Sequence, residues 1–555
     1  MKARALLLIA MLLPAWAGSS MATPNAFLAL QASRQVDRVA LPGDQGEVVL
    51  TQLNPAVNAW LLLTVPAPDG RGTINHHLEN ADPASQRVSL DASAPGHLRI
   101  ASAAGDTTCA LWPGPALVLA ARARLAYAPL CGGRLMLRNR VSGNRSTLEA
   151  MTGFLRDHVW GGERIIGFVK RELYRDAFVE RAGAALSAAP ADTAVAADPG
   201  APQAATLLAG AVPRAIVADG LGIDLGPRSR ALQPGGWVAA AGLGGVWISI
   251  VQPGSLAAGL DAVEAEALAY LVAFDLGTLE LGFALGTDHP RLGWSARVPP
   301  ERVDANLSGP DGFDSAEPLL RTGMLAPPLL ERVVATFTGG FKREHGAFSR
   351  GALAAVNRGS HYGFVEQGVV FSRLQPGLAT LLVFNDGSVE MKTWQRDDQR
   401  RLADVRHARQ NGVPLVEPGP DGAPVSGRLV DHWSAGNWSG SSDEQLRTLR
   451  AGACLLENAG RRHLVYGYFS SATPRAMARV FGAYGCRYAM HLDMNALEHT
   501  YLALYPRHGA EIGVEHLVPG MAVLDRSVGK TLLPRFLGFG DSRDFFYLTR
   551  RKERR

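Results

Sequence analysis

The hydrophobic and polar positions along the chain follow different periods, which divide the sequence into regions. Between about residues 26 and 140, short apolar runs often alternate with polar positions and are separated by Pro, Gly, Asn and Asp. This pattern predicts a small all-β accessory domain. From residue 146 to about 185, apolar residues recur at three- and four-residue spacing, which predicts a helical segment. Residues 186–206 are rich in Ala, Pro and Asp, so we expect a flexible linker there.

The remainder of the chain, residues 207–550, combines strand-like apolar runs with a few helical ones. The run "RVVATF", from Arg332 to Phe337, predicts a buried strand, and Gly339 and Gly340 follow it, where the backbone can turn. Further on, Thr473 has the chemistry of a helix N-cap and Pro474 suits the first helical position. A strand, a helix and a strand are therefore expected in the C-terminal part. Together these patterns predict an α+β fold for the large region.

The first residues have the features of an export signal. Lys2 and Arg4 precede the apolar run "ALLLIAMLLPAWA", and Ser20 and Ala22 supply the small residues that a signal peptidase requires. We therefore predict a signal peptide over residues 1–22 and a secreted or periplasmic protein. The alternative is an uncleaved anchor helix, although the run is shorter than the roughly 20 residues that span a bilayer. In the mature chain we expect no transmembrane segment.

Composition and cysteine spacing narrow the classes of function. The 555 residues are 47% hydrophobic and 19% charged, which is typical of a globular protein. The net charge is +5, but the basic residues are spread along the chain apart from the terminal "RRKERR", so nucleic-acid binding is not expected.

Four cysteines allow three disulfide connectivities in an exported chain. We expect the local pairs, Cys109 with Cys131 and Cys454 with Cys486, with buried free thiols as the alternative.

The stretch "CRYAMHLDMNALEHTYLALY" concentrates chemically active side chains near the C-terminus. If "YAMHLDMN" is a strand, His491, Asp493 and Asn495 share one face by the two-residue period. Polar groups on a buried face are costly unless they bond to something, which favours a site. Glu498 and His499 follow and could act as acid, base or orienting group. The alternative is that these groups only bond to one another, to the backbone or to solvent. A metal site also stays open, although the spacing matches no strong motif.

Two cationic residues could bind an anionic substrate. Lys342 follows the turn at Gly339 and Gly340, where the backbone can approach a ligand closely, and its ammonium could neutralise a phosphodiester. Arg450 lies at the start of a predicted strand and could clamp a phosphate. A solvated loop charge and a surface salt bridge are the respective alternatives.

The order of several short motifs resembles the phosphodiester glycosidase domain family. The motifs are "FTGGF" after a strand, "GFVEQGVV", "LRAGACL", "SSAT" before a helix and "AMHLDMN" after it. The resemblance spans about residues 263–547. It implies a mixed-sheet C-terminal domain and an exported hydrolase that cleaves a sugar-1-phosphodiester or a related glycosidic bond. A carbohydrate or sugar-phosphate substrate is implied, with no cofactor, although a divalent metal stays open.

The chain departs from the family pattern at three motifs. In the family's N-G-G-F-F, the Asn falls on Thr338 and the last Phe on Lys342. In R-T-A-I-G, only Arg450 matches, and in L-D-G-G-G-S, Asp493 stays while Met, Asn and Ala replace the three glycines. A Gly-rich loop allows close backbone approach to a sugar or phosphate, so its loss closes that option or changes the ligand. The competing hypothesis is a non-catalytic cell-envelope module that binds glycan or a protein partner.

The mechanism that the resemblance implies needs three kinds of group. A cation binds the phosphate leaving group, a carboxylate stabilises the oxocarbenium-like transition state or activates water, and an imidazole carries a proton. We therefore predict catalytic roles for Asp493, His491, Glu498 and His499, and substrate contacts for Gly339, Gly340, Lys342, Arg450 and Asn495.

Overall fold

The structure is a computed structural model that describes most of the chain between residues 27 and 552. The described residues are 27–43, 45–147, 149–151, 176–182, 198, 200–211, 214–217, 219–226, 232–289, 292–295, 298, 300–313, 315–343, 362–431, 447–458, 460–509 and 511–552. The predicted signal peptide, most of the predicted helical segment and residues 186–197 of the predicted linker lie outside them. None of the helices in the described part combines the length and apolar character that a bilayer crossing requires.

Strands dominate the regular structure, so the predicted α+β class is wrong for the described part of the chain. Its α-helices are α1 (Pro115–Arg122), α4 (Ala262–Glu266) and α6 (Pro474–Ala483). Short 3-10 helices are η1 (Leu28–Leu30), η2 (Cys131–Gly133), η3 (Pro253–Ser255), η4 (Pro300–Arg302), η5 (Pro327–Leu329), η7 (Arg396–Asp404) and η9 (Pro519–Leu524). The apolar run "AYLVAFD", compatible with a helix or a buried strand, forms a strand with every residue buried. A strand buried on both faces shows no alternation, so its period does not distinguish it from a helix.

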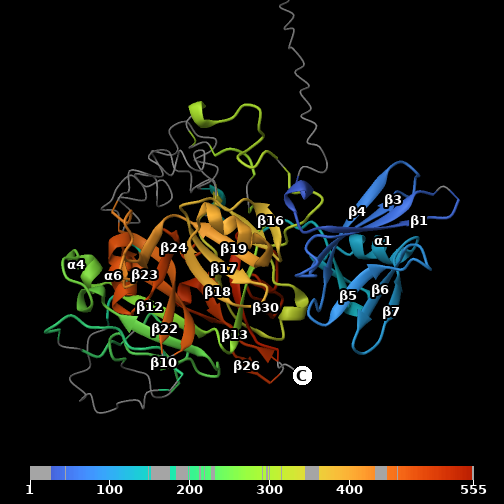
Figure 1. The fold of residues 1–555 in the computed structure, drawn as a ribbon. Coiled ribbons are helices and arrows are strands. Elements are labelled where there is room, and N and C mark those ends of the chain that lie inside the picture. Colours follow the sequence, from blue (N-terminus) through green and yellow to red (C-terminus); the bar gives the residue numbers. More distant parts are fainter. Residues whose placement is uncertain are drawn as a thin grey trace, which may run out of the picture.

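The N-terminal unit consists of two antiparallel sheets. Figure 1 shows it in blue beside the body of the molecule. The six-stranded sheet has the order β1 (Gln35–Ala40), β2 (Glu47–Gln52), β3 (Trp60–Pro66), β4 (Thr73–Asn80), β9 (Leu135–Arg138) and β8 (Tyr127–Leu130). The second sheet contains β5 (Gln86–Leu90), β6 (His97–Ser102) and β7 (Thr107–Ala110). Alternate apolar residues of both sheets, such as Leu50, Leu63 and Ile100, form a separate core with α1.

An eight-stranded sheet forms the centre of the large region. Its order is β10 (Val238–Ala239), β11 (Val246–Val251), β12 (Ala269–Asp275), β23 (Arg461–Ala472), β22 (Thr448–Asn458), β24 (Tyr488–Met494), β20 (Pro414–Pro418) and β21 (Pro424–Ser426). The ladders along it are antiparallel, which corrects the expected mixed sheet. Helix α6 begins as predicted, because the Thr473 side chain accepts the Ala476 N–H and Pro474 occupies the first turn. Gly452 and Gly467 leave room for the Phe481 ring of this helix.

Two five-stranded antiparallel sheets complete the large region. The first has the order β13 (Leu279–Ala284), β31 (Phe545–Arg550), β14 (Val333–Thr338), β25 (Leu502–Leu504) and β28 (Glu515–His516). The second has the order β16 (Val369–Ser372), β15 (Phe364–Glu366), β19 (Val405–Asn411), β17 (Ala379–Phe384) and β18 (Val389–Thr393). Two hairpins are β26 (Arg507–His508) with β27 (Glu511–Ile512), and β29 (Arg526–Val528) with β30 (Thr531–Leu533).

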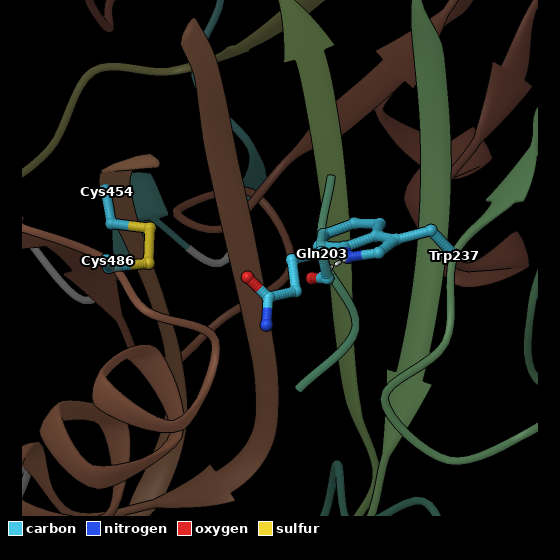
Figure 2. Close-up of a disulfide and its surroundings, with 4 residues drawn as sticks. All are labelled: Gln203, Trp237, Cys454 and Cys486. Atoms are coloured by element: carbon cyan, nitrogen blue, oxygen red, sulfur yellow. Dashed lines mark hydrogen bonds between the residues drawn. A yellow bond between two sulfur atoms is a disulfide. The ribbon is translucent and has the colours of Figure 1, made fainter. Parts of the chain in front are cut away.

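Two disulfides confirm the predicted local pairing. Cys109 bonds to Cys131 in the N-terminal unit, and Cys454 bonds to Cys486 between β22 and the residues before β24. Figure 2 shows the second bond, together with the Trp237 indole N–H that donates to the Gln203 carbonyl at 2.9 Å. Disulfides are typical of chains that fold in an oxidising compartment outside the cytosol.

Candidate functional site

Strand β24 carries the candidate residues into the centre of the large sheet. The register places Met494 opposite Arg450 and His491 opposite Gly452 on the neighbouring strand β22. All seven residues of β24 are buried, so each of its polar side chains needs a partner inside the protein. The partners of Asp493 and His491 differ, and they divide the predicted site into two parts.

The first part is a cluster of charges that meets at the end of β24. The Asp493 carboxylate accepts a hydrogen bond from Arg543 at 2.6 Å and another from its neighbour's N–H, that of Met494, at 2.8 Å. Arg543 also donates to the Glu149 carboxylate at 3.1 Å, and the Lys342 ammonium lies 2.8 Å from the same carboxylate. These contacts connect segments from four parts of the chain. We call the group the charge cluster, and its members are Glu149, Lys342, Asp493, Glu498, His499 and Arg543.

His499 places an imidazole ring beside two carboxylates of the charge cluster. Its Nδ1 is 2.8 Å from the Met494 carbonyl, which can only accept, so Nδ1 carries a proton. The Nε2 atom lies 3.5 Å from the Glu498 carboxylate, and Nδ1 lies 3.9 Å from that of Asp493. In the charged form of the ring Nε2 donates toward Glu498, and in the neutral form it can take up a proton. The side chain is 19% exposed, so water can reach part of the ring, whereas its Nε2 atom is itself buried.

Electrostatics keep the Glu149 and Glu498 carboxylates of the charge cluster ionised. Burial acts to raise the pKa of Glu149, but the charges of Arg543, Lys342 and His499 outweigh it and lower that pKa strongly. Burial likewise opposes ionisation of Glu498, but its hydrogen bond and charge interaction with His499 lower the pKa overall. For Arg543, burial acts to lower the pKa, and the surrounding carboxylates raise it above its ordinary value. The cluster therefore holds ionised acids and a permanent cation near neutral pH.

The second part lies in the core and contains His491 and Arg450. The Arg450 guanidinium donates to the Ala472 carbonyl at 2.8 Å and lies 3.2 Å from Nε2 of His491. Burial, with a contribution from Arg450, holds the pKa of His491 well below its usual range, so the ring is neutral. Both side chains are fully buried, and the His491 ring packs on Phe341 with centroids 4.8 Å apart. The structure thus places these two predicted residues in the sheet interior.

The predicted glycine turn faces a buried ion network. Gly340 has φ +136°, and a Cβ atom there would lie 3.1–3.2 Å from the side chains of Asn411 and Arg409. Arg409 in turn donates to the Asp544 carboxylate at 2.8 Å and to the Phe341 carbonyl at 2.6 Å. The space that these glycines leave is therefore taken by protein side chains. Gly339 contacts the same network, because its own Cβ position lies 2.6 Å from the Asp544 carboxylate.

Asn495 occupies the position where the resembled family has a glycine. Its φ is +79°, a left-handed conformation that Asn tolerates better than most residues. Its N–H donates to the Leu449 carbonyl at 2.8 Å, and its side-chain oxygen accepts from the Thr448 hydroxyl at 3.2 Å. The backbone shape that glycine supports is retained here, and the added side chain bonds back to the protein.

Sequence reasoning missed the partners that complete the charge cluster. Arg543 lies in "GFGDSRDFF", a run of charged residues directly before the fully apolar start of β31, and Asp544 follows it. Charged residues directly before a buried strand need partners inside the protein, so this run could have indicated Arg543 and Asp544. Glu149 lies in the region that was interpreted only as a helix. Among the described residues, no group of three or more His, Cys, Asp or Glu side chains is arranged to hold a metal ion.

Comparisons with known proteins give little further support. No family model matches the chain, and no curated protein matches it. One similar solved structure is the catalytic domain of zebrafish N-acetylglucosamine-1-phosphodiester alpha-N-acetylglucosaminidase, auto-inhibited by its pro-peptide. Its TM-score is 0.30 at 9% identity, covering 56% of this chain and 85% of that one. Another is a candidate exported protein from Burkholderia pseudomallei, with a TM-score of 0.19 at 11% identity, covering 51% of this chain and 73% of that one. Similarities of this size carry no argument about activity.

Proposed function

We propose that the protein is an exported hydrolase that cleaves a sugar-1-phosphodiester or a related glycosidic bond at the charge cluster. The observation that supports this most directly is the meeting of carboxylates, an imidazole and two cations from distant segments. The cluster is also accessible in part, because the side chains of His499 and Lys342 are 19% and 11% exposed. Transfer of a glycosyl group from phosphate requires these three kinds of group in one place.

The geometry favours a specific division of roles. Lys342 is the cation available to a phosphate, because it could exchange its contact with Glu149 for the substrate oxygens. Glu498 is ionised near neutral pH, which suits a carboxylate that stabilises positive charge at the anomeric carbon. His499 lies beside it with Nε2 able to accept a proton from water. Asp493 is held by Arg543 and its neighbour's N–H, so it positions the cluster. A phosphate leaves readily and needs little acid assistance.

One observation favours the competing function, a non-catalytic envelope module that binds glycan or a protein partner. Two of the carboxylates are already matched by cations, Asp493 by Arg543 and Glu149 by both Arg543 and Lys342. A fully paired cluster can serve packing alone. Only the hydrolase turns over a substrate, so one set of assays can distinguish the two functions.

Turnover of sugar-1-phosphodiesters and p-nitrophenyl glycosides by the purified exported form tests the proposal. We expect His499→Asn to lower kcat by about 10²–10⁴-fold, the range for general acid–base groups. Glu498→Gln should lower kcat by about 10²–10³-fold, the range for a group that stabilises charge in the transition state. Asp493→Asn should also lower turnover because it loosens the cluster. Glu511→Gln, at an exposed position of β27, is the matched control and should retain wild-type rates. Circular dichroism checks that each variant folds.

Two outcomes would reject the hydrolase. Unchanged turnover in Glu498→Gln and Asp493→Asn would separate the activity from the charge cluster. Binding to a glycan array without turnover of any substrate would support the envelope module instead.

A further inference from the structure

A cavity lies where the N-terminal unit meets both five-stranded sheets of the large region. Its volume is about 160 Å³, which is large enough for several water molecules or one small organic group. The walls come from β4 and β9 of the N-terminal unit, from β13 and β31, and from β17, β19 and the turns beside them. In Figure 1 this junction lies between the blue sheets and the body of the molecule. The charge cluster contributes no residue to it.

One wall of the cavity carries the hydroxyl group of Tyr547, which has no hydrogen-bond partner among the described residues. The residue as a whole is 7% exposed. Its ring lies directly over Gly282, where a Cβ atom would come within 2.1 Å of the ring. Burial raises the pKa of Tyr547, so the hydroxyl keeps its proton and can donate. A hydroxyl that faces a cavity and has no protein partner can donate to a bound group.

A second unmatched donor lies on the neighbouring strand β19. Arg406 lines the cavity and uses its Nε to donate to the side-chain oxygen of Gln367 at 3.0 Å. In the described part of the chain, no carboxylate lies within ion-pair distance of this guanidinium. Its two terminal nitrogens therefore remain available as a fork, the arrangement that suits a carboxylate or a phosphate.

The other charges of the cavity wall are already engaged. Glu79 accepts the Trp60 indole N–H at 3.2 Å and forms a close ion pair with Arg138. Arg332 lies 3.3 Å from Glu280, and its buried Nε has no hydrogen-bond partner among the described residues. Asp386 also lines the cavity, and its carboxylate accepts from the N–H and the hydroxyl of Ser388 at 2.8 and 2.6 Å. In the described part of the wall, the Arg406 guanidinium is thus the charged group that lacks an oppositely charged or hydrogen-bonding partner for its terminal nitrogens. A ligand with a pair of acceptor atoms matches these two nitrogens.

We propose that this cavity binds a small ligand, or the end of a larger one, through a carboxylate or phosphate group. The Arg406 fork binds the oxyanion and the Tyr547 hydroxyl donates to one of its oxygens. Because the walls come from both the N-terminal unit and the large region, an occupied cavity also joins the two. The site is separate from the proposed hydrolase function and does not depend on it.

Calorimetric titration of the full chain with inorganic phosphate and, separately, with propionate tests this proposal and distinguishes the two oxyanions. We expect Arg406→Gln to weaken binding of the preferred probe about tenfold or more, the range for a hydrogen bond to a charged group. Tyr547→Phe should weaken it about two- to tenfold. Arg400→Gln, at an exposed position of η7, is the matched control and should bind as wild type. Lys342→Gln removes the other candidate phosphate contact and should leave binding at the cavity unchanged.

Three results would overturn the site. The first is that neither probe binds to the wild-type chain. The second is that Arg406→Gln and Tyr547→Phe both bind as tightly as the wild type. The third is phosphate binding that Lys342→Gln alone abolishes. If Arg406→Gln fails to fold, Tyr547→Phe decides, because it removes a hydroxyl that no described residue bonds. Hydrolytic turnover of the Arg406→Gln chain should equal that of the wild type. Failure of the hydrolase proposal is therefore seen in a different assay.

Discussion

Replacement of Arg543 by Met should destabilise the protein more than any loss of an exposed ion pair. The guanidinium is 2% exposed and contacts Asp493 at 2.6 Å and Glu149 at 3.1 Å. Met has a similar length but no charge, so the variant leaves two carboxylates largely buried without this cation. Removing one partner of a buried pair costs about 3–5 kcal/mol. That is a large part of the roughly 5–15 kcal/mol by which a domain is stable.

Urea unfolding followed by intrinsic fluorescence measures this cost at pH 7. The matched control is Arg475→Met, which breaks an exposed pair with Asp431 and should cost no more than about 1 kcal/mol. In a double-mutant cycle, Asp493→Asn should reduce the cost of Arg543→Met by about 0.5–3 kcal/mol, because no ionised carboxylate is then left at that position. A cost equal to that of the control, or strict additivity in the cycle, would refute the assigned contact.

Acid provides an independent measure of the same contact. Burial opposes the ionisation of Glu149, yet Arg543 and two other cations lower its pKa below the unfolded value near 4.5. The stabilisation is therefore present above about pH 4.5 and is lost as the pH falls below it. Arg543→Met should lose less stability than the wild type between pH 5 and pH 3. An unchanged acid dependence would show that Arg543 does not act on Glu149.

Three further perturbations test other parts of the fold. Burial raises the pKa of Glu366 to about 8, so the folded state holds its proton where the unfolded chain releases it, and stability should fall as the pH rises from about 4.5 to 8. Glu366→Gln should remove this pH dependence, and at pH 9 the variant should be more stable than the wild type by a few kcal/mol. If the free energy of unfolding changes with pH in parallel for the two proteins, the raised pKa of Glu366 is contradicted. Paired Ser substitution of Cys454 and Cys486 should lower the free energy of unfolding by about 3–4 kcal/mol, because this disulfide spans 32 residues. In mild dithiothreitol, alkylation and mass spectrometry should detect loss of the partly exposed Cys109–Cys131 bond before the buried one, and simultaneous loss would argue against their difference in burial.

Features set by neighbouring residues could be predicted from the sequence. Thr473 and Pro474 specify the start of α6 because capping depends on groups within one helical turn. Cysteines 22 and 32 residues apart paired locally, as expected. The strand that ends at the glycine turn was also visible, because six consecutive β-favouring or small residues precede it.

Features that depend on distant residues could not be predicted in this way. The period of "AYLVAFD" does not show whether helices or strands will cover it, and neighbouring strands on both sides decided the outcome. Arg543 reaches Glu149 across 394 positions and Asp493 across 50. No pattern along the chain specifies such partners, because they depend on how the sheets are placed in space.

The polar face predicted for β24 shows why the partners of a residue matter more than its type. Both His491 and Asp493 needed buried partners, and both have them. His491 faces Arg450 inside the sheet, where both side chains are fully buried. Asp493 faces Arg543 and His499, and through them a cluster with partly exposed side chains. Catalysis requires a group that a substrate can reach. Any activity at the end of β24 therefore belongs to the charge cluster around Asp493. A substitution at His491 should therefore act through stability, whereas one at His499 should act on turnover.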